Sequence, residues 1–248
     1  MKIFAIGMNY AQHNKELDGT LYKPETPVVF TKADSALLKD RKPFFVPDFM
    51  GRIDYETELV VRISRLGKGI SQRFAHRYYD AVTVGIDFTA RDLQQKLRAQ
   101  GLPWELCKGF DGSAALGEWL PIERFRSVDA LHFHLDQNGK TVQGGCTSDL
   151  LFKVDELIAY ISSFFTLKTG DLIFFPRSAE HIISSEADCN NCGDTIHISN
   201  DGAFTIESSG SGGEKSLDLF CARFEYDEHA DIMHDLPETV LIKMDHPS

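Results

Sequence analysis

Long apolar runs are missing from this sequence. No window of the 248-residue chain approaches the roughly 18 consecutive apolar residues of a membrane-spanning helix, so no membrane partner is expected. The first residues, Met1–Gly7, contain too short an apolar run for a signal peptide and no cleavage-site pattern. The five cysteines are odd in number and do not form a disulfide framework, which indicates reduced thiols. Together these absences predict a cytoplasmic protein.

Positive charge is scarce as well. The chain has 26 Lys and Arg against 37 Asp and Glu, and its formal net charge is −11. This charge argues against nucleic acid or an anionic membrane surface as a partner. Nine acidic and three basic residues in 214–248 give that segment −6, which leaves −5 for the first 213 residues. The composition, 42% hydrophobic and 25% charged, is that of a soluble globular protein with a sizeable core.

Nucleotide-binding and zinc-binding patterns are incomplete. The glycine-rich stretch Ser208–Gly213 lacks the Lys-Ser/Thr that follows a phosphate-binding loop. One C-x-x-C pair, Cys189 and Cys192, has no second pair, so free cysteines in a polar loop are favoured over a zinc site with His181 and His197. The chain contains no internal repeat.

Strand-like segments outnumber helical ones. Alternation and β-branched residues predict strands over Lys2–Ile6, Val28–Lys32, Ile53–Ile63, Thr83–Thr89, Leu131–Leu135, Thr141–Gln143, Leu172–Phe175, Leu217–Phe224 and Thr239–Met244. Helical spacing or composition predicts helices over Met8–Leu17, Ser71–Val82, Ala90–Gln100 and Val154–Phe165. The fold predicted from this pattern is α+β with a mixed, β-rich core and few helices.

The strand-like stretch Ile53–Ile63 carries two carboxylates on one face. Glu56 and Glu58 are two residues apart and therefore project from the same side of a strand, while the opposite side is mostly apolar and faces the core. Two adjacent carboxylates repel each other unless a cation or protons offset the charge. Mg²⁺ and Ca²⁺ take oxygen ligands of this kind. The alternative is a solvated polar face.

Further acidic and basic residues extend this pattern. Asp87, near the end of the next predicted strand, adds a third carboxylate, and Lys108 follows in a loop that contains Trp104. Three carboxylates suit Mg²⁺ or Mn²⁺, which can chelate a 2-oxo acid and stabilise its enolate as a Lewis acid. Lys108 is either a second positive charge for that enolate or a surface lysine.

On the predicted N-terminal helix, His13 and Glu16 are three residues apart and share a face. They form either a hydrogen-bonded pair with a function or an exposed polar pair.

Six motifs in order resemble the small single-domain members of the fumarylacetoacetate hydrolase family. They are Gly7–His13, Tyr55–Leu59, Asp87–Gln94, Pro103–Lys108, Asn138–Phe152 and Thr166–Ile173. Each motif alone is weak, but six in the right order and spacing are specific. The resemblance covers roughly residues 1–175 and implies a catalytic domain there. Residues 176–248 are then an atypical C-terminal segment, acidic at 214–248, that completes the same domain.

The resemblance implies a mixed β-roll or barrel-like core with a few peripheral helices, a homodimer and a Mg²⁺ or Mn²⁺ site. It assigns metal ligation to Glu56, Glu58 and Asp87, catalysis to His13, Glu16 and Lys108, and substrate binding to Asn9, Tyr10, Arg91 and Gln94. The activity it implies is metal-dependent cleavage of a C–C bond in a small 2-oxo acid by an acylpyruvate hydrolase-like enzyme. Oxaloacetate decarboxylation and isomerisation of a 2-oxo-diacid are reached through the same enolate.

The chain departs from the family after Ile173. Family members usually continue with a Thr-Gly-Thr-Pro turn that closes over the substrate carboxylate, whereas this chain reads Phe-Phe-Pro-Arg-Ser from Phe174 to Ser178. Threonine hydroxyls and the close backbone approach of glycine are therefore missing. The alternative to an enzyme is a non-catalytic member that binds a metal or a small acid and acts as an interaction protein.

Overall fold

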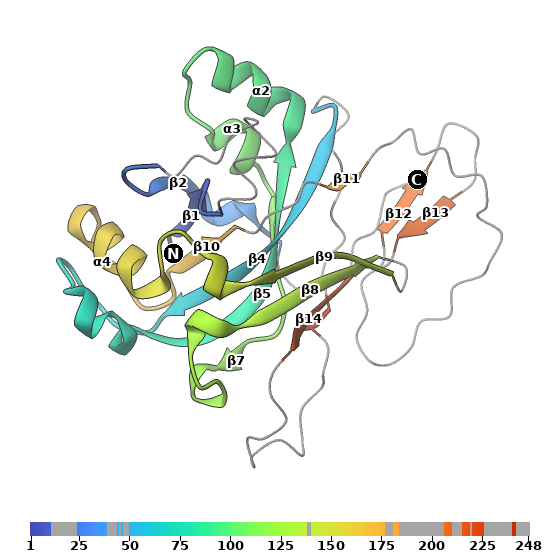
Figure 1. The fold of residues 1–248 in the computed structure, drawn as a ribbon. Helices are drawn as coiled ribbons and strands as arrows, with labels where there is room; N and C mark the ends of the chain where they lie inside the picture. Colours follow the sequence, from blue (N-terminus) through green and yellow to red (C-terminus); the bar gives the residue numbers. More distant parts are fainter. Residues whose placement is uncertain are drawn as a thin grey trace.

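The computed structural model describes residues 1–10, 24–38, 44, 46, 50–137, 140–176, 181–183, 206–209, 215–218, 220–225 and 240–241. Within these residues a mixed, curled β-sheet dominates and few helices accompany it (Figure 1). This confirms the β-rich α+β fold predicted from the sequence. No helix among the described residues is long and apolar enough to cross a membrane.

The main sheet has nine strands in the described part of the chain. Along its path these are β2 (Val28–Lys32), β1 (Ile3–Gly7), β10 (Leu172–Phe175), β4 (Ile53–Ile63), β5 (Tyr79–Ala90), β6 (Ala114–Leu116) and β3 (Leu37–Leu38). Two more strands lie off this path: β11 (His181–Ile183) pairs with β4, and β7 (Leu120–Pro121) pairs with β5. β1 runs parallel to β10 and β3 parallel to β6, while the other pairs are antiparallel. The long strands β4 and β5 form its centre (Figure 1).

A second sheet contains strands from the C-terminal part of the chain. Its order is β15 (Val240–Leu241), β14 (Phe220–Glu225), β8 (His132–Gln137) and β9 (Lys140–Cys146). β12 (Ile206–Ser209) and β13 (Lys215–Asp218) form a separate antiparallel pair. Strands beyond residue 176 thus pair with strands of both larger sheets, β11 with β4 and β14 with β8.

The helices are short and few in the described residues. They are α2 (Arg91–Ala99), α3 (Glu105–Lys108) and α4 (Val154–Phe164), with 3₁₀ turns η1 (Asp34–Ala36), η2 (Gln72–Arg77), η3 (Ile122–Arg124), η4 (Val128–Ala130) and η5 (Thr147–Asp149). α2 and α3 lie together where β5 ends, and α4 lies apart from them (Figure 1). The strand and helix predictions therefore hold for β2, β4, α2 and α4.

Two helix predictions fail in the described residues. Instead of a helix over Ser71–Val82, the structure has the 3₁₀ turn η2, and β5 begins at Tyr79. The pairing of this region with β4 overrides its mixed spacing. The helix expected from Met8 does not begin there, because Met8 has a φ of 57° and Tyr10 forms a β-bridge to Leu150. Residues 11–17 lie outside the described part.

The hydrophobic core explains the alternation of β4. Ile53, Tyr55 and Leu59 belong to one large buried cluster, to which α4 also contributes. Val60, on the opposite face, belongs to a smaller cluster with residues of β1 and β10. Every residue of β4 except Arg62 is buried, so the face that carries Glu56 and Glu58 is not a solvated one. The sequence left that alternative open, and the structure excludes it.

Candidate metal centre

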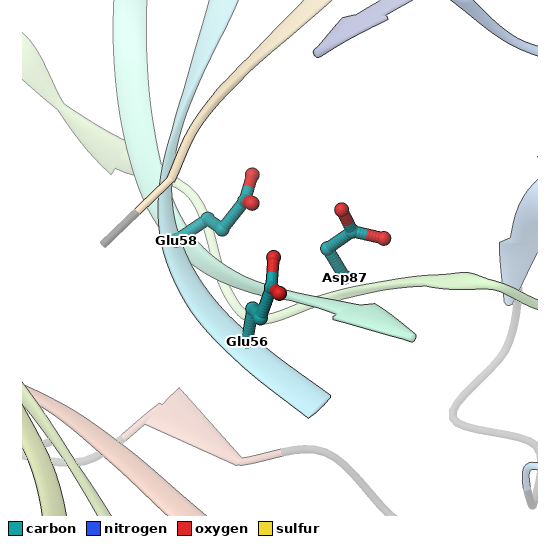
Figure 2. Close-up of side chains that lie close together, drawn as sticks. All are labelled: Glu56, Glu58 and Asp87. Atoms are coloured by element: carbon teal, nitrogen blue, oxygen red, sulfur yellow. The ribbon is translucent and has the colours of Figure 1, made fainter. Parts of the chain in front are cut away.

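The strand pairing of β4 with β5 brings the three predicted carboxylates together. Glu56 lies directly opposite Asp87 in the antiparallel register, and Glu58 is two residues along the same face. One oxygen from each of these residues lies within 4.8 Å of the other two. Figure 2 shows the three carboxylates pointing toward a common space from two neighbouring strands. All three side chains are buried.

The backbone around Glu56 and Glu58 is supported by a side chain rather than a strand. β10 pairs with the second half of β4 and β11 with its first residues, and neither pairs with Glu56–Glu58. At this gap Gln143 of β9 takes the place of a strand. Its Oε1 accepts from the Thr57 N–H at 2.9 Å, and its Nε2 donates to the Tyr55 carbonyl at 3.1 Å. The two backbone groups of β4 that flank Glu56 at this gap are therefore hydrogen-bonded by the Gln143 side chain.

Glu58 is the least satisfied member of the triad. Its Oε2 is buried and has no hydrogen-bond partner among the described residues. Burial, followed by repulsion from Asp87, raises the pKa of Glu58 well above its usual value. A buried carboxylate oxygen without a donor is costly, and a cation would remove that cost.

Lys108 lies between the other two carboxylates. Its Nζ donates to Glu56 Oε2 and to Asp87 Oδ2, each at 2.8 Å. Burial alone would lower the pKa of Lys108, but the charges of Asp87, Glu56 and Glu58 outweigh it and hold the pKa above its usual value. The lysine is therefore a buried, permanently charged ammonium and not a surface side chain. It reaches the site from α3, which places Lys108 in the last turn of the helix that begins at Glu105.

A second buried lysine, Lys32, lies on the far side of Asp87. Its Nζ donates to Asp87 Oδ1 at 2.6 Å and to the carbonyl oxygen of Lys108. Ser113 offers its carbonyl oxygen at 3.3 Å and its Oγ at 3.4 Å. Burial lowers the pKa of Lys32, and the charge of Asp87 offsets only part of that effect. The sequence did not predict a role for Lys32, and its one signal is a lysine at the end of the strand Val28–Lys32, whose first three residues are apolar.

Arg91 holds the other side of Glu56. Its Nη2 donates to Glu56 Oε1 at 2.7 Å, its Nε to Asp54 Oδ2 at 2.6 Å, and its Nη1 to Gln94 Oε1 at 2.5 Å. Arg52 closes the series on Asp54 Oδ1 at 2.7 Å. Cations and anions thus alternate along one series of ion pairs: Arg52, Asp54, Arg91, Glu56, Lys108, Asp87 and Lys32. Glu58 is the one carboxylate of the triad outside this series.

These charged side chains line one pocket of the described structure. Its charged and polar lining is Glu56, Glu58, Asp87, Arg91, Gln94 and Lys108. The remaining wall is Ile6, Gly7, Met8, Phe30, Trp104 and Pro176. A small acid with one charged end and one apolar or extended end matches this division.

The family model described as "Fumarylacetoacetate (FAA) hydrolase C-terminal" matches residues 2–208 of the chain. The chain belongs to the fumarylacetoacetate hydrolase family. Oxaloacetate tautomerase YcgM of Escherichia coli (strain K12) is 36% identical over 173 residues, which are 69% of this chain and 78% of YcgM. The mitochondrial oxaloacetate decarboxylase of Dictyostelium discoideum is also 36% identical over 173 residues, with the same shares of 69% and 78%.

A solved structure from Yersinia pestis CO92, of a protein assigned to the same family, has a TM-score of 0.73 at 27% identity. The likeness covers 91% of this chain and 89% of that one. It confirms the predicted curled, mixed sheet of the fumarylacetoacetate hydrolase type.

The family resemblance also gave roles to residues outside the triad. Gln94 lines the pocket beside Arg91. The buried Asn9 side chain accepts from the Phe152 N–H at 2.8 Å and donates to its carbonyl at 3.1 Å. Tyr10 donates its hydroxyl to the Cys146 carbonyl at 3.0 Å. His13 and Glu16 lie outside the described residues, so their catalytic role stays a prediction.

The divergent segment after Ile173 begins at the pocket. β10 ends at Phe175, and the next residue, Pro176, is part of the pocket wall. Residues 177–180 and the C-x-x-C pair lie outside the described part of the chain. Among the described residues, Cys107 and Cys146 are free cysteines.

The residues of the triad fit a hard divalent cation. They offer carboxylate oxygens, the donor type that Mg²⁺ and Mn²⁺ prefer. One of those oxygens, on Glu58, is buried without a partner among the described residues. Without a cation, Glu58 is also repelled by the carboxylates of Asp87 and Glu56. The buried triad is therefore consistent with a divalent metal ion, and the assignment of these residues as its ligands stays a prediction.

Proposed function

We propose that this chain is a Mg²⁺- or Mn²⁺-dependent enzyme that acts on a small 2-oxo acid, with oxaloacetate as its favoured substrate. One observation carries this proposal: Glu58 has a buried oxygen without a partner among the described residues, its carboxylate lies together with those of Glu56 and Asp87, and the Lys108 ammonium contacts the latter two. Relatives at 36% identity are an oxaloacetate tautomerase and an oxaloacetate decarboxylase, which supports this choice of substrate.

Glu56, Glu58 and Asp87 would hold the ion. When bound, a divalent ion supplies a Lewis acid that withdraws electrons from the keto group of a 2-oxo acid. Lys108, charged and buried at the same place, stabilises negative charge that develops on the keto oxygen. Arg91 and Gln94 face the same pocket and orient a carboxylate of the substrate. The common product of these interactions is a stabilised enolate.

The balance of charge favours a dianionic substrate. The alternating series contains four cations and three carboxylates, and Glu58 adds a fourth carboxylate, so the cluster is neutral when all are ionised. A divalent ion then leaves two positive charges in excess in a buried place. A dicarboxylate such as oxaloacetate neutralises both, whereas an acylpyruvate with one carboxylate neutralises only one.

Three reactions pass through an enolate. In tautomerisation the enol hydroxyl loses its proton and C3 of the resulting enolate gains one, and in decarboxylation the C3–C4 bond of the 2-oxo form breaks, CO₂ leaves and the electron pair forms the enolate of pyruvate. Neither reaction needs an activated water. Hydrolysis of an acylpyruvate needs a general base for water, the role that the family resemblance assigns to His13 and Glu16. The relatives named above support the first two reactions, and hydrolysis stays the second candidate on the strength of that sequence motif.

Metal-dependent turnover tests the proposal. Protein stripped with EDTA is supplied with Mg²⁺ or Mn²⁺ and then with oxaloacetate, and enol absorbance and pyruvate are followed separately; acetylpyruvate is the parallel substrate. Heat-denatured protein with the same ion gives the background of the uncatalysed reaction. We expect turnover of oxaloacetate that EDTA abolishes. If neither substrate shows metal-dependent turnover, the proposed enzymatic function is refuted, and the alternative of a non-catalytic interaction protein is favoured.

A matched pair of variants links the turnover to the triad. Glu58→Gln keeps the shape of the side chain and removes its charge, and we expect kcat/KM to fall by about a hundredfold or more. Glu123→Gln makes the same change at an exposed position in η3 and should leave kcat/KM unchanged. Equal turnover by Glu58→Gln and the parent would show that the triad does not take part in the reaction.

The remaining predictions concern the whole protein. We propose that the chain forms a homodimer and that residues 176–248 complete the domain of residues 1–175. The pairing of β11 with β4 and of β14 with β8 supports the second statement. Light scattering during size-exclusion chromatography measures the first. A monomeric mass at micromolar concentration would contradict the dimer.

A further inference from the structure

Lys32 does more than balance the charge of Asp87, because it also contacts the backbone of Lys108. Its buried ammonium joins Asp87, a residue of the triad, to the backbone of Lys108 through hydrogen bonds to Asp87 Oδ1 and the Lys108 carbonyl. Ser113 braces the same place, since its Oγ donates to that carbonyl at 2.8 Å. Lys32 is not part of the pocket wall. It therefore acts on the site from behind Asp87.

The two oxygens of Asp87 are bound by different lysines. Oδ1 is held at 2.6 Å by Lys32, which lies behind the pocket, and Oδ2 is held at 2.8 Å by Lys108, which lines it. A cation that used both oxygens would approach the Lys32 ammonium closely in a buried environment, where like charges repel strongly. Asp87 is thereby restricted to offering a single oxygen to an ion in the pocket.

The two oxygens of Glu56 are likewise bound by different cations. Arg91 holds its Oε1 at 2.7 Å, and Lys108 holds its Oε2 at 2.8 Å. Glu58 alone keeps an oxygen without a partner in the described part of the chain. The protein thus supplies a small number of oxygens, and water or substrate must supply the rest. Mg²⁺ accepts this readily because it keeps several waters, whereas Ca²⁺ takes about 6–8 oxygens and uses bidentate carboxylates.

We propose that Lys32 is a positioning residue that keeps Asp87 a one-oxygen ligand and so makes the site prefer Mg²⁺ and Mn²⁺ over Ca²⁺. This inference rests on the proposed metal site and adds a cause for its selectivity. It requires Lys32 to act through Asp87 and not through contact with the substrate.

Calorimetry on the full-length, EDTA-stripped protein tests the proposal without reference to turnover. Titration with Mg²⁺, Mn²⁺ and Ca²⁺ in turn gives three dissociation constants, and we expect the parent to bind Ca²⁺ at least about tenfold more weakly than Mg²⁺. If none of the three ions binds, the proposed metal site itself fails. If Ca²⁺ binds as tightly as Mg²⁺, the site stands and the role of Lys32 is overturned.

Variants of Lys32 then isolate the cause. Lys32→Met removes charge and donor together, and we expect the ratio of the Ca²⁺ to the Mg²⁺ dissociation constant to fall by about tenfold. The lost charge alone strengthens both ions equally, so the ratio reports on Asp87 and not on net charge. Lys32→Gln keeps a donor and should give an intermediate ratio, and it carries the test if Lys32→Met does not fold. Lys96→Met, exposed on α2, is the matched control.

An unchanged ratio in a folded Lys32 variant would overturn the proposal. Circular dichroism of each variant, compared with the parent, establishes that it is folded. A merely structural role for Lys32 would weaken the binding of all three ions in parallel and leave the ratio where it is.

Discussion

Glu56 of β4 is the directly opposite strand partner of Asp87 in β5, and the Lys108 ammonium donates to one oxygen of each at 2.8 Å. The register forces the two carboxylates together, and the lysine offsets the repulsion that this creates. The proposed function therefore gives Lys108 two roles: it stabilises the site before an ion binds, and it would stabilise the enolate afterwards. The two roles make separate predictions.

Replacing Lys108 with methionine should destabilise the metal-free protein strongly. The change leaves buried carboxylates without their cation, a loss of about 3–5 kcal/mol in the free energy of unfolding. Saturating Mg²⁺ should recover much of this loss, because the ion neutralises the same oxygens. Urea denaturation with EDTA and with Mg²⁺ measures both values. The control is Lys96→Met, and an equal loss in both conditions would show that Lys108 and the ion do not share the carboxylates.

The same variant should also lose turnover even where Mg²⁺ restores its stability. Without the ammonium, negative charge on the substrate's keto oxygen has only the ion to stabilise it, and loss of one such charge costs about 10²–10³ in kcat. Steady-state kinetics at saturating Mg²⁺ measures this. Unchanged kcat in a folded, metal-bound Lys108→Met would confine the residue to a structural role.

Gln143 offers a test of how the glutamates are positioned. Gln143→Leu removes the partners of the Thr57 N–H and the Tyr55 carbonyl, which flank Glu56 in a buried part of β4. We expect a loss of about 1–3 kcal/mol in the free energy of unfolding and weaker Mg²⁺ binding. Denaturation and calorimetry measure the two effects. Gln95→Leu, exposed on α2, is the control. Lost stability with unchanged Mg²⁺ affinity would mean that the gap does not position the glutamates.

The sequence predicts the local part of this site well. Alternation within one strand has a period of two, so the shared face of Glu56 and Glu58 follows from their spacing alone. The length and strand-forming residues of Ile53–Ile63 likewise predict β4 with its bounds as observed. The helix α2 follows from composition and ends next to Gly101, as a C-terminal glycine predicts.

The non-local part could not be read from the residues. The placement of Asp87 opposite Glu56 depends on strand register, which spacing does not give. The family resemblance implied only that the two residues share a metal site. Lys32 is 55 residues from Asp87 in the chain, and Gln143 is 86 residues from Thr57. Neither carries a local pattern, since a buried lysine and a glutamine that replaces a strand resemble ordinary polar residues until the chain is folded. Tertiary contacts decide both.

Gly85 of β5 should not accept a side chain without strain, because its neighbours are too close. It lies opposite Glu58, and a Cβ there would be 2.7 Å from Val60 Cγ2 and 2.9 Å from Phe174 Cε1. Gly85→Ala should therefore cost about 1–3 kcal/mol in the free energy of unfolding through overpacking. The shift of β5 should also weaken Mg²⁺ binding, because Asp87 is two residues away.

The matched control for this change is Gly144→Ala in β9, where a Cβ would meet only the His134 Cβ at 4.0 Å. Its effect on stability should be within about 0.5 kcal/mol, as for other substitutions without a steric consequence. Thermal and urea denaturation of both variants give the comparison. Equal effects of the two substitutions would mean that the tight contact at Gly85 is relieved by movement of its neighbours.

Cys107 should be protected from alkylation as long as α3 stays packed. Burial raises the pKa of its thiol to about 11, and Lys108, the next residue, offsets this only in part. A free thiol has a pKa of about 8.5, so at pH 8 the thiolate of Cys107 should be about two hundredfold scarcer than that of an ordinary cysteine. In the folded protein Cys107 is a neutral thiol, and only its thiolate reacts. Raising the pH toward 11 should therefore increase the labelling rate of Cys107 by about tenfold per pH unit.

Iodoacetamide labelling followed by peptide mass spectrometry measures this protection. Cys146, which the structure leaves slightly more exposed than Cys107, should react first in the folded protein, and both should react alike in urea. Because Cys107 precedes Lys108 on α3, its labelling rate also reports whether the helix that carries Lys108 opens. Labelling of Cys107 as fast as Cys146 at pH 8 would mean that α3 opens readily, and Lys108 would then not be held in place before the ion binds.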